Sequence, residues 1–408
     1  MSDNIENKIT IEIDGTNYED FLSADVSRRF DEFCGTFDFK CTKADADDFN
    51  IDNNSYCDIY VNDKKVMTGV IDKVSPSDDA NSSDVNITGR DITCDIVDSC
   101  IPTSISLSGE FDLVTVVEKV VEALGLSDKI SVINEIPDLK PFTSADIVSA
   151  EVDKNAFEFM NEYAQKVSAI LITNEDGNIV ITRAGESSKT VPDKILNIVD
   201  PEGNGGDDNN VLSSSAEYDF SQRYYKYIVV SQGNANTEKN KISIENVSQK
   251  GEAIDEEVRQ SRVLVIKADN ACNSATCEEI ATLECNVRRA NSLKYSCTVA
   301  GYMLNDGNPY SINTIMQVID DDNFINSELL VKGVTFSFGD GSVTGLEFAV
   351  KDAYTLQANL DEIDARTNKT DNKKKKSGGK KSSGGKKGDK PIVLTPAQQK
   401  ELNNALGM

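Results

Sequence analysis

The first 41 residues constrain the fold more than any other stretch of the chain. Apolar and polar side chains alternate over residues 9–13, the period-two pattern of a half-buried strand. Asp14-Gly15 follows at once, and this dipeptide after a strand is a strong hairpin signal. A second alternation covers residues 37–41, after a polar link that holds Arg28 and Arg29. The chain therefore begins with a β-meander that needs further strands to cover it.

Strand patterns occur near both ends of the chain. Short strands are indicated over residues 57–93 and again over 293–350, with the spacing of a small sandwich or barrel. The stretches around Gly69-Val70 and Gly333-Val334 resemble each other. This weak repeat suggests two related β-domains.

The middle of the chain mixes helix and strand. Apolar residues from Leu113 to Leu124 lie on one helical face. Asp112 is the predicted N-cap and Gly125 the stop. Further elements are a helix from Asp153 to about Ser168, a hairpin over 169–182 and a helix over 271–290.

These patterns predict an α+β, mostly β fold, with two antiparallel β-barrel or sandwich domains and an inserted α/β domain. The predicted parts are a first β-domain at 1–100, an α/β domain at 101–198 completed by 236–292, a second β-domain made of 211–235 and 293–355, a flexible Lys/Gly/Ser linker at 356–390 and a short C-terminal docking helix at 391–408.

The composition favours a protein made in a reducing compartment. No run of about 18 apolar residues is present, so no transmembrane helix is predicted. The polar N-terminus is unlike a secretory signal. Nine cysteines are an odd number and stand mostly at strand-like positions. We interpret them as reduced, buried thiols.

The net charge of −27 is distributed unevenly. Lys373–Lys390 holds nine lysines and one acid, or +8, so the rest of the chain carries −27 − 8 = −35. A body this acidic repels nucleic acid, although solubility alone also explains it. The basic tail has no apolar residue to bury and is expected to be a flexible linker; the alternative is binding to nucleic acid or anionic lipid.

The last residues, 394–408, have the pattern of a short helix, with Thr395 as N-cap and Pro396 at the first position. Leu394, Leu402 and Leu406 are the candidate partner-binding residues, and the last two are spaced i, i+4. An isolated helix of this length is marginal in water. It therefore either docks on a partner or frays.

The sequence predicts no catalytic, metal or cofactor site. Histidine is absent, which excludes Ser-His-Asp and Cys-His catalysis and every His-ligated metal. Phosphate-binding, nucleophile-elbow and dinucleotide motifs are also missing. The acidic stretch 199–210 lacks EF-hand spacing and is interpreted as a solvated loop rather than a calcium site.

Several motifs together resemble the baseplate hub proteins of contractile-tailed phages, the late-control protein D and Mu-like tail hub group. In chain order they are the hairpin and G-x-F-x-F strand within 8–41, GRDITCDIVDSC at 89–100, the helix-plus-hairpin module at 152–186, and the closing strands over 299–338 with KDAY at 351–354. The likeness covers about residues 8–355. It departs at Pro309-Tyr310, where the family usually has a tryptophan and this chain has none.

The resemblance implies a structural protein of a phage tail baseplate, or of a related injection device, assembled in the host cytoplasm. Its two β-domains would be tube-like, and three chains would form a homotrimeric ring that adapts the six-fold tail tube to the three-fold central spike. The implied partners are further copies of this chain, spike, tail tube, tape-measure and baseplate wedge proteins. DNA would pass through the ring without specific binding.

Two other functions stay open at this point. The helix-plus-hairpin module resembles small cell-wall-binding modules, so the alternative is a peptidoglycan-binding or peptidoglycan-degrading tail-tip protein. A nucleic-acid binder that uses the lysine tail is the third.

We predict that none of the nine cysteines forms a disulfide, because the chain has no secretory signal. Alkylation of the denatured protein without reductant, followed by intact-mass measurement, should show nine labelled thiols. Fewer than nine labels would contradict this prediction.

Overall fold

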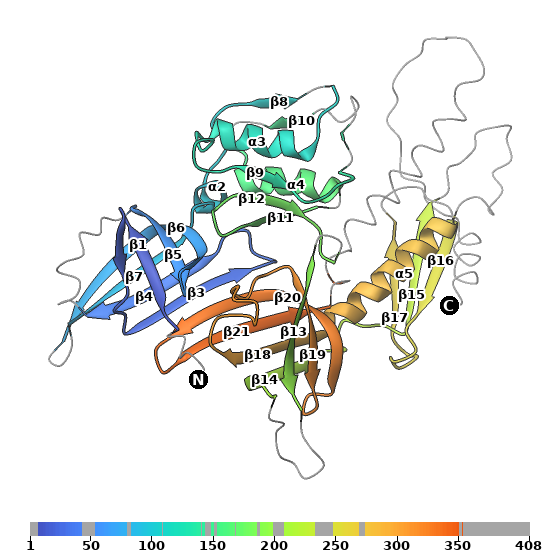
Figure 1. Ribbon diagram of the computed structural model, residues 1–408. Helices are drawn as coiled ribbons and strands as arrows, with labels where there is room; N and C mark the ends of the chain where they lie inside the picture. The colour runs from blue at the N-terminus through green and yellow to red at the C-terminus, as the bar shows by residue number, and fades with distance from the viewer. Residues whose placement is uncertain are drawn as a thin grey trace. The chain divides into compact units, whose positions relative to one another are not determined.

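The structure is a computed structural model (Figure 1), which describes residues 7–42, 54–79, 83–107, 109–139, 141–142, 148–150, 153–167, 169–185, 188–198, 208–232, 248–268, 274–350 and 353. The chain divides into two units, Met1–Thr367 and Asn368–Met408. The second unit, which contains most of the predicted linker and the predicted docking helix, lies outside the described residues.

The predicted α+β, mostly β fold is confirmed, and one large sheet of 13 strands dominates it. Its strands are β1 (Ile9–Ile13), β2 (Thr16–Tyr18), β3 (Ser23–Arg29), β4 (Thr36–Thr42), β5 (Tyr56–Val61), β6 (Lys64–Asp78), β7 (Ser83–Asp91), β13 (Lys189–Asn197), β14 (Val211–Tyr218), β18 (Leu293–Ala300), β19 (Thr314–Asp320), β20 (Ile325–Phe338) and β21 (Ser342–Ala349). We call β1–β7 the first β-half, and β13, β14 and β18–β21 the second β-half.

The first β-half grows from the opening hairpin that the sequence predicts. Asp14 and Gly15 both have positive φ, 50° and 77°, and they connect β1 to β2. In Asp and Gly this conformation is accessible at low cost. The alternating isoleucines of β1 are buried, as are Phe37, Phe39 and Cys41 of β4. Both predicted alternations therefore face the core.

The second β-half repeats the strand order of the first. The hydrogen-bonded order is β1-β5-β6-β7-β4-β3 in the first half and β13-β19-β20-β21-β18-β14 in the second. The strands correspond one to one along the chain as well, with β2 as an extra strand in the first half. One difference is that β1 pairs antiparallel with β5, whereas β13 pairs parallel with β19.

A bulge in each half fixes how the two halves correspond. The β6–β7 pairing shifts between Ile71 and Lys73, and the β20–β21 pairing shifts between Val331 and Gly333. Matching the bulges places Ile71 on Val331. The sequence similarity instead places Gly69 on Gly333, and hence Ile71 on Thr335, which is four residues away. The short sequence match is therefore out of register with the strand pairing, although both indicate a repeat.

An α/β module lies between the two halves. It contains α2 (Cys94–Asp98), β8 (Ile105–Leu107), α3 (Leu113–Ala123), β9 (Val132–Asn134), β10 (Val148–Ala150), α4 (Ala156–Lys166), β11 (Ile170–Thr173) and β12 (Ile179–Thr182). Asp112 accepts a hydrogen bond from the Thr115 amide at the start of α3, and Gly125 has φ +72° after its end. Both predicted helix signals are confirmed, as is the β11–β12 hairpin.

A second, smaller module lies between β14 and β18. It holds β15 (Lys226–Gln232), β16 (Ser248–Ile254), β17 (Val263–Lys267) and α5 (Ser274–Asn291). The sheet order is β16-β15-β17. Tyr227, Val229, Cys277 and Cys285 share its own small core. The predicted helix over 271–290 corresponds to α5.

Three segments pair differently from the grouping expected from the sequence. β13 lies within 101–198 but pairs with β19 of the large sheet. β15 lies within 211–235 but pairs with β16 and β17. The described parts of segment 236–292, namely β16, β17 and α5, therefore pack with β15 rather than with 101–198, because the apolar face of α5 covers β15 and β16. The division into two tube-like domains stays a prediction.

Gly89 in β7 should be intolerant of a side chain. A Cβ there would lie 2.2 Å from the Val70 carbonyl oxygen and 2.2 Å from Cζ of Phe37. The backbone oxygen cannot move without disturbing the β6–β7 pairing. Gly89→Ala should therefore lower the free energy of unfolding by about 1–3 kcal/mol, measured by urea denaturation followed by circular dichroism.

Gly345→Ala is the matched control, because Gly345 is a strand glycine of β21 whose nearest neighbours would lie 3.8 Å from the new Cβ. It should be neutral or stabilising by up to about 1 kcal/mol. Equal effects of the two substitutions would contradict the packing argument.

Candidate functional site: the joined and the free strand edges of the two β-halves

In the part of the chain that the structure describes, one strand pair, β3 with β20, joins the two β-halves. Residues 333–338 of β20 pair antiparallel with Arg29 down to Ala24 of β3. The Phe30 amide extends the ladder by donating to the Lys332 carbonyl at 2.6 Å. Val26 and Phe336 lie opposite each other and are buried. In Figure 1 this junction lies where blue β3 runs beside orange β20.

Side chains reinforce the same junction on its other face. The hydroxyls of Ser27 and Thr335 are 3.1 Å apart, and Ser337 Oγ donates to Asp25 at 2.5 Å. Next to them Arg29 bonds to Glu347 at 2.5 Å. Burial opposes the charge of Arg29, but its hydrogen bonds to Asp31 and Glu347 raise its pKa well above the ordinary value. The joined edge therefore combines an apolar face with a polar, ion-paired face.

The first free edge belongs to β6. The early part of β6 pairs with β5, and the last bonds on that side join Ile71 to Asn54 and Ser55. Beyond them residues 73–77 pair with β7 alone among the described residues. The side chains of this segment are exposed or half-buried. Within the described ranges, residues 73–77 therefore form an edge strand.

The second free edge belongs to β14. Its ladder runs from Val211 to Tyr218 against β18, and among the described residues no other strand pairs with it. Tyr218 is 49% exposed, and Leu212 and Phe220 near its two ends are also exposed. Exposed apolar side chains beside an open ladder mark a surface suited to pairing with another chain.

Buried Asp320 holds β14 in place. It accepts hydrogen bonds from Tyr295 Oη at 2.8 Å, Asn323 Nδ2 at 3.0 Å and the Asn323 amide at 3.0 Å. Burial opposes its charge, but hydrogen bonds from Ser214, Asn323 and Tyr295 lower its pKa. Because Ser214 lies on β14, this carboxylate ties β14 to the β19–β20 turn. Its stabilisation is present at neutral pH and is lost as the pH falls through the lowered pKa.

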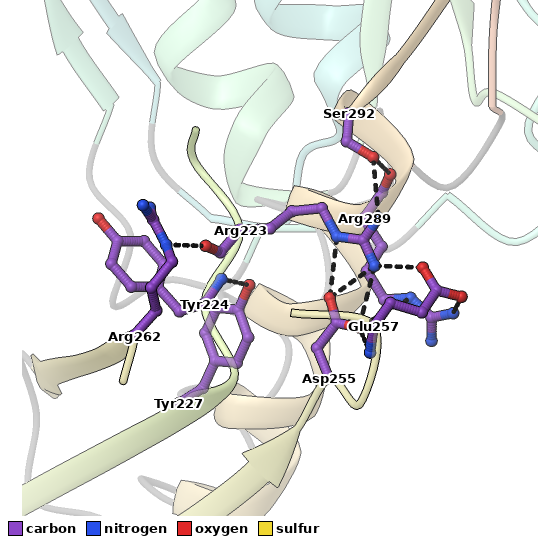
Figure 2. Close-up of polar contacts among 8 residues, drawn as sticks. All are labelled: Arg223, Tyr224, Tyr227, Asp255, Glu257, Arg262, Arg289 and Ser292. Atoms are coloured by element: carbon purple, nitrogen blue, oxygen red, sulfur yellow. Dashed lines mark hydrogen bonds and ion pairs between the residues drawn. The ribbon is translucent and has the colours of Figure 1, made fainter. Parts of the chain in front are cut away.

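The end of β14 continues into a clamp, which we define as Arg223, Asp255, Glu257, Arg289 and Ser292 (Figure 2). Arg223 donates to both oxygens of Asp255 at 2.9 Å and to Glu257 at 2.6 Å. Arg223 is 4% and Asp255 1% exposed. Burial opposes the charge of Arg223, but the bonds to Glu257 and Asp255 raise its pKa.

The clamp fixes both connections of the smaller module. Arg223 lies on the entry from β14, and Ser292 lies on the exit into β18, 3.4 Å from Arg223 Nη1. The Asp219 amide also donates to the Ser292 carbonyl at 2.8 Å, so entry and exit run side by side. The module is therefore held at a defined position on β14 and β18.

A separate polar network joins β7 to the first α/β module. Buried Asp91 accepts from the Gly35 amide at 2.8 Å, from the Thr93 amide at 2.8 Å and from Thr173 Oγ1 at 2.9 Å. Arg28 donates to the Thr173 carbonyl, and burial lowers its pKa. The network connects the first β-half to the β11–β12 hairpin.

The described residues offer little for catalysis. None of the eight described cysteines forms a disulfide. Burial raises the pKa of Cys57, Cys94 and Cys297 to about 12, so these are poor nucleophiles. Within the described ranges no group of three or more metal-ligating side chains is placed to hold a metal ion. No described helix is long and apolar enough to cross a membrane.

The predicted partner-binding residues Leu394, Leu402 and Leu406 lie outside the described residues, so their role stays a prediction. Sequence reasoning missed the free edges of β6 and β14 and also the clamp. The signal for the edges was weak: Pro76 within β6 is typical of an edge strand. The burial of Arg223 has no signature in the sequence.

We predict that the clamp is a main stabilising contact of the smaller module. Arg223→Met leaves buried Asp255 without its bidentate partner, which should lower the free energy of unfolding by about 3–5 kcal/mol. Urea denaturation followed by circular dichroism measures it. Adding Asp255→Leu should recover much of the loss, because both charges are then removed.

Lys294→Met is the control, because it breaks an exposed ion pair. The side chain of Lys294 is 64% exposed and that of its partner Glu217 is 61% exposed. It should cost no more than about 1 kcal/mol. If Arg223→Met is as mild as Lys294→Met, the clamp is not a main stabilising contact.

Two sequence comparisons match the chain to baseplate proteins of phage Mu. Residues 8–91 match the family model described as Mu phage baseplate assembly protein GpP-like, N-terminal. The chain is 23% identical over 364 residues to the baseplate hub protein gp44 of Escherichia phage Mu, covering 88% of this chain and 91% of that protein.

Two solved structures share the fold. The 43 kDa tail protein of prophage MuSo2 from Shewanella oneidensis matches with a TM-score of 0.69 at 23% identity, over 86% of this chain and 99% of that one. The tail protein from Neisseria meningitidis MC58 matches with a TM-score of 0.67 at 18% identity, again over 86% and 99%. The resemblance to the Mu-like group of baseplate hub proteins, inferred from the ordered sequence motifs, is confirmed by these matches.

Proposed function

We propose that this protein is a structural baseplate hub of a contractile phage tail or of a related injection device. The observation that supports this most is the repeat of one strand order within a single chain. The similarity to the Mu baseplate hub protein gp44 over most of both chains points the same way. The function is mechanical and non-catalytic.

The repeat suggests how the hub adapts two symmetries. Two corresponding β-halves per chain, in a ring of three chains, give six corresponding units. Such a ring matches a six-fold tail tube on one face. The two inserted modules occur once per chain, so the other face keeps the three-fold symmetry that a central spike requires.

The proposed partners follow from this position. They are two further copies of this chain, the tail tube and tape-measure proteins, the central spike and the baseplate wedge, all in the tail of the virion. The acidic excess of the chain, if it lines the ring, keeps passing DNA from binding. A peptidoglycan-binding or peptidoglycan-degrading tail tip is the alternative, and release of soluble fragments from purified peptidoglycan would favour it.

The ring predicts the mass of the assembly. Mass photometry of the purified chain at increasing concentration should show a species of three times the 44.5 kDa chain mass. Reconstruction of the assembled tip should show three copies with near six-fold symmetry of the β-halves. Six copies in the ring, or β-halves that do not superpose, would contradict the proposal.

A further inference from the structure

The internal repeat assigns a partner to the free edges of β6 and β14. We propose that residues 73–77 of β6 in one copy pair antiparallel with β14 of the next copy, in the same geometry by which β20 pairs with β3 inside each chain. The proposal rests on the ring proposed above and specifies its contact strand by strand.

β6 and β20 are equivalent strands of the two β-halves. Each pairs with the preceding strand, β5 or β19, over its first part, and with the following strand, β7 or β21, over its second part. The bulges set Ile71 on Val331. After Val331, β20 leaves β19 and its open edge pairs with β3 from Gly333 onward. After Ile71, β6 leaves β5, but the open edge of residues 73–77 has no second strand partner among the described residues.

β14 is likewise equivalent to β3. β3 pairs with β4, β4 with β7, and β7 with β6; β14 pairs with β18, β18 with β21, and β21 with β20. By these pairing registers, Ala24 of β3 is equivalent to Ser214 of β14, and Val26 is equivalent to Ala216. The outer edge of β3 is occupied by β20. The outer edge of β14 is the one without a strand partner in the described part of the chain.

The two free edges cannot satisfy each other within one chain as it is paired. Six strands separate β14 from β6 in the large sheet, namely β18, β21, β20, β3, β4 and β7. Because neighbouring strands lie about 4.8 Å apart, these six strands keep the two edges of one chain too far apart to pair with each other. A second copy supplies what each edge lacks, and repetition of the contact in three copies closes the ring without a remaining open edge on these strands.

The inferred register brings compatible side chains together. Carrying the β20–β3 pairing across the repeat sets Lys73 opposite Asp219, Val74 opposite Tyr218 and Ser75 opposite Glu217. The first pair joins opposite charges, and the second covers part of exposed Tyr218. In the third pair, Ser75 corresponds to Thr335 and Glu217 corresponds to Ser27. The hydroxyls of Ser27 and Thr335 lie 3.1 Å apart within the chain.

Pro76 makes the contact between copies weaker than the junction within the chain. It corresponds to Phe336 and lies opposite Ala216 in the inferred register, but it has no N–H to donate. Proline on an edge strand also protects that strand from indiscriminate pairing. The missing bond is consistent with a contact that forms on assembly rather than during folding of one chain.

A disulfide scan tests the register directly. The full chain would carry Ser75→Cys and Glu217→Cys, with exposed Cys100 replaced by serine, and would be oxidised with copper phenanthroline at a concentration where trimers are present. Because Phe30 donates to Lys332, the 335–27 pair is of the non-hydrogen-bonded kind, and so is the inferred 75–217 pair. Cα atoms in such pairs are about 4.5 Å apart, within disulfide range.

The expected product is a closed covalent trimer on a non-reducing gel. Ser27→Cys with Thr335→Cys is the positive control, and it should bridge within one chain and run as a monomer. Ser75→Cys with Ser213→Cys is the register control. Ser213 is four residues along β14 from position 217, about 13 Å away, so it should not bridge.

The outcomes separate this inference from the ring itself. Trimers that form but do not cross-link at 75–217, or that cross-link equally at 75–213, overturn the strand register and leave the ring standing. Cross-linked chains of indefinite length support the strand pairing and contradict a closed trimer. Absence of any assembly overturns both.

A charge substitution gives a second readout that needs no oxidation. Lys73→Glu would face Asp219 and Glu217, and it should raise the concentration at which trimers dissociate by roughly fivefold. Lys64→Glu is the control, because Lys64 lies in the part of β6 that pairs with β5. An equal effect of both substitutions would contradict the assigned edge.

Discussion

The hydrogen-bonded ladder between β3 and β20 is the contact on which the rest of the structure depends. It joins residues about three hundred positions apart in the sequence, and the entropy of closing such a loop must be offset by what the contact buries. The ladder makes one sheet of two, so that β1–β7 and β18–β21 share a single apolar core. It also leaves β6 and β14 as the edges that the same type of contact does not cover.

The inserted modules are compatible with this sheet because each enters and leaves it within a short distance. The smaller module occupies the position between β14 and β18 that in the first β-half is a short link between β3 and β4. Such an insertion leaves the strand ladder unchanged when its two ends run together, as Asp219 and Ser292 do. The buried charges of Arg223 and Asp255 then fix its position, since separating them would leave each charge buried and unpaired.

Local patterns predicted the elements well, and long-range pairing accounts for what they missed. The alternation in β1 and β4, the Asp14-Gly15 turn and the capping of α3 by Asp112 act over a few residues, so the sequence contains them directly. The pairing of β13 with β19 and of β15 with β16 depends on partners more than a dozen residues away. The edges of β6 and β14 could not be predicted from the sequence, because assigning an edge requires the pairing of every strand in the sheet.

The two free edges differ in a way that favours pairing with each other over pairing with themselves. The β6 edge carries Pro76 and the exposed acid Asp72, which oppose addition of an arbitrary strand. The β14 edge has no proline and can offer a full ladder, but Glu217 and Asp219 surround it with negative charge. Two β14 edges would therefore repel each other, whereas Lys73 on β6 meets both acids. The preference for β6–β14 pairing over β14–β14 pairing then follows from charge and from the open ladder together. It needs no large apolar patch, which would promote aggregation of the unassembled chain.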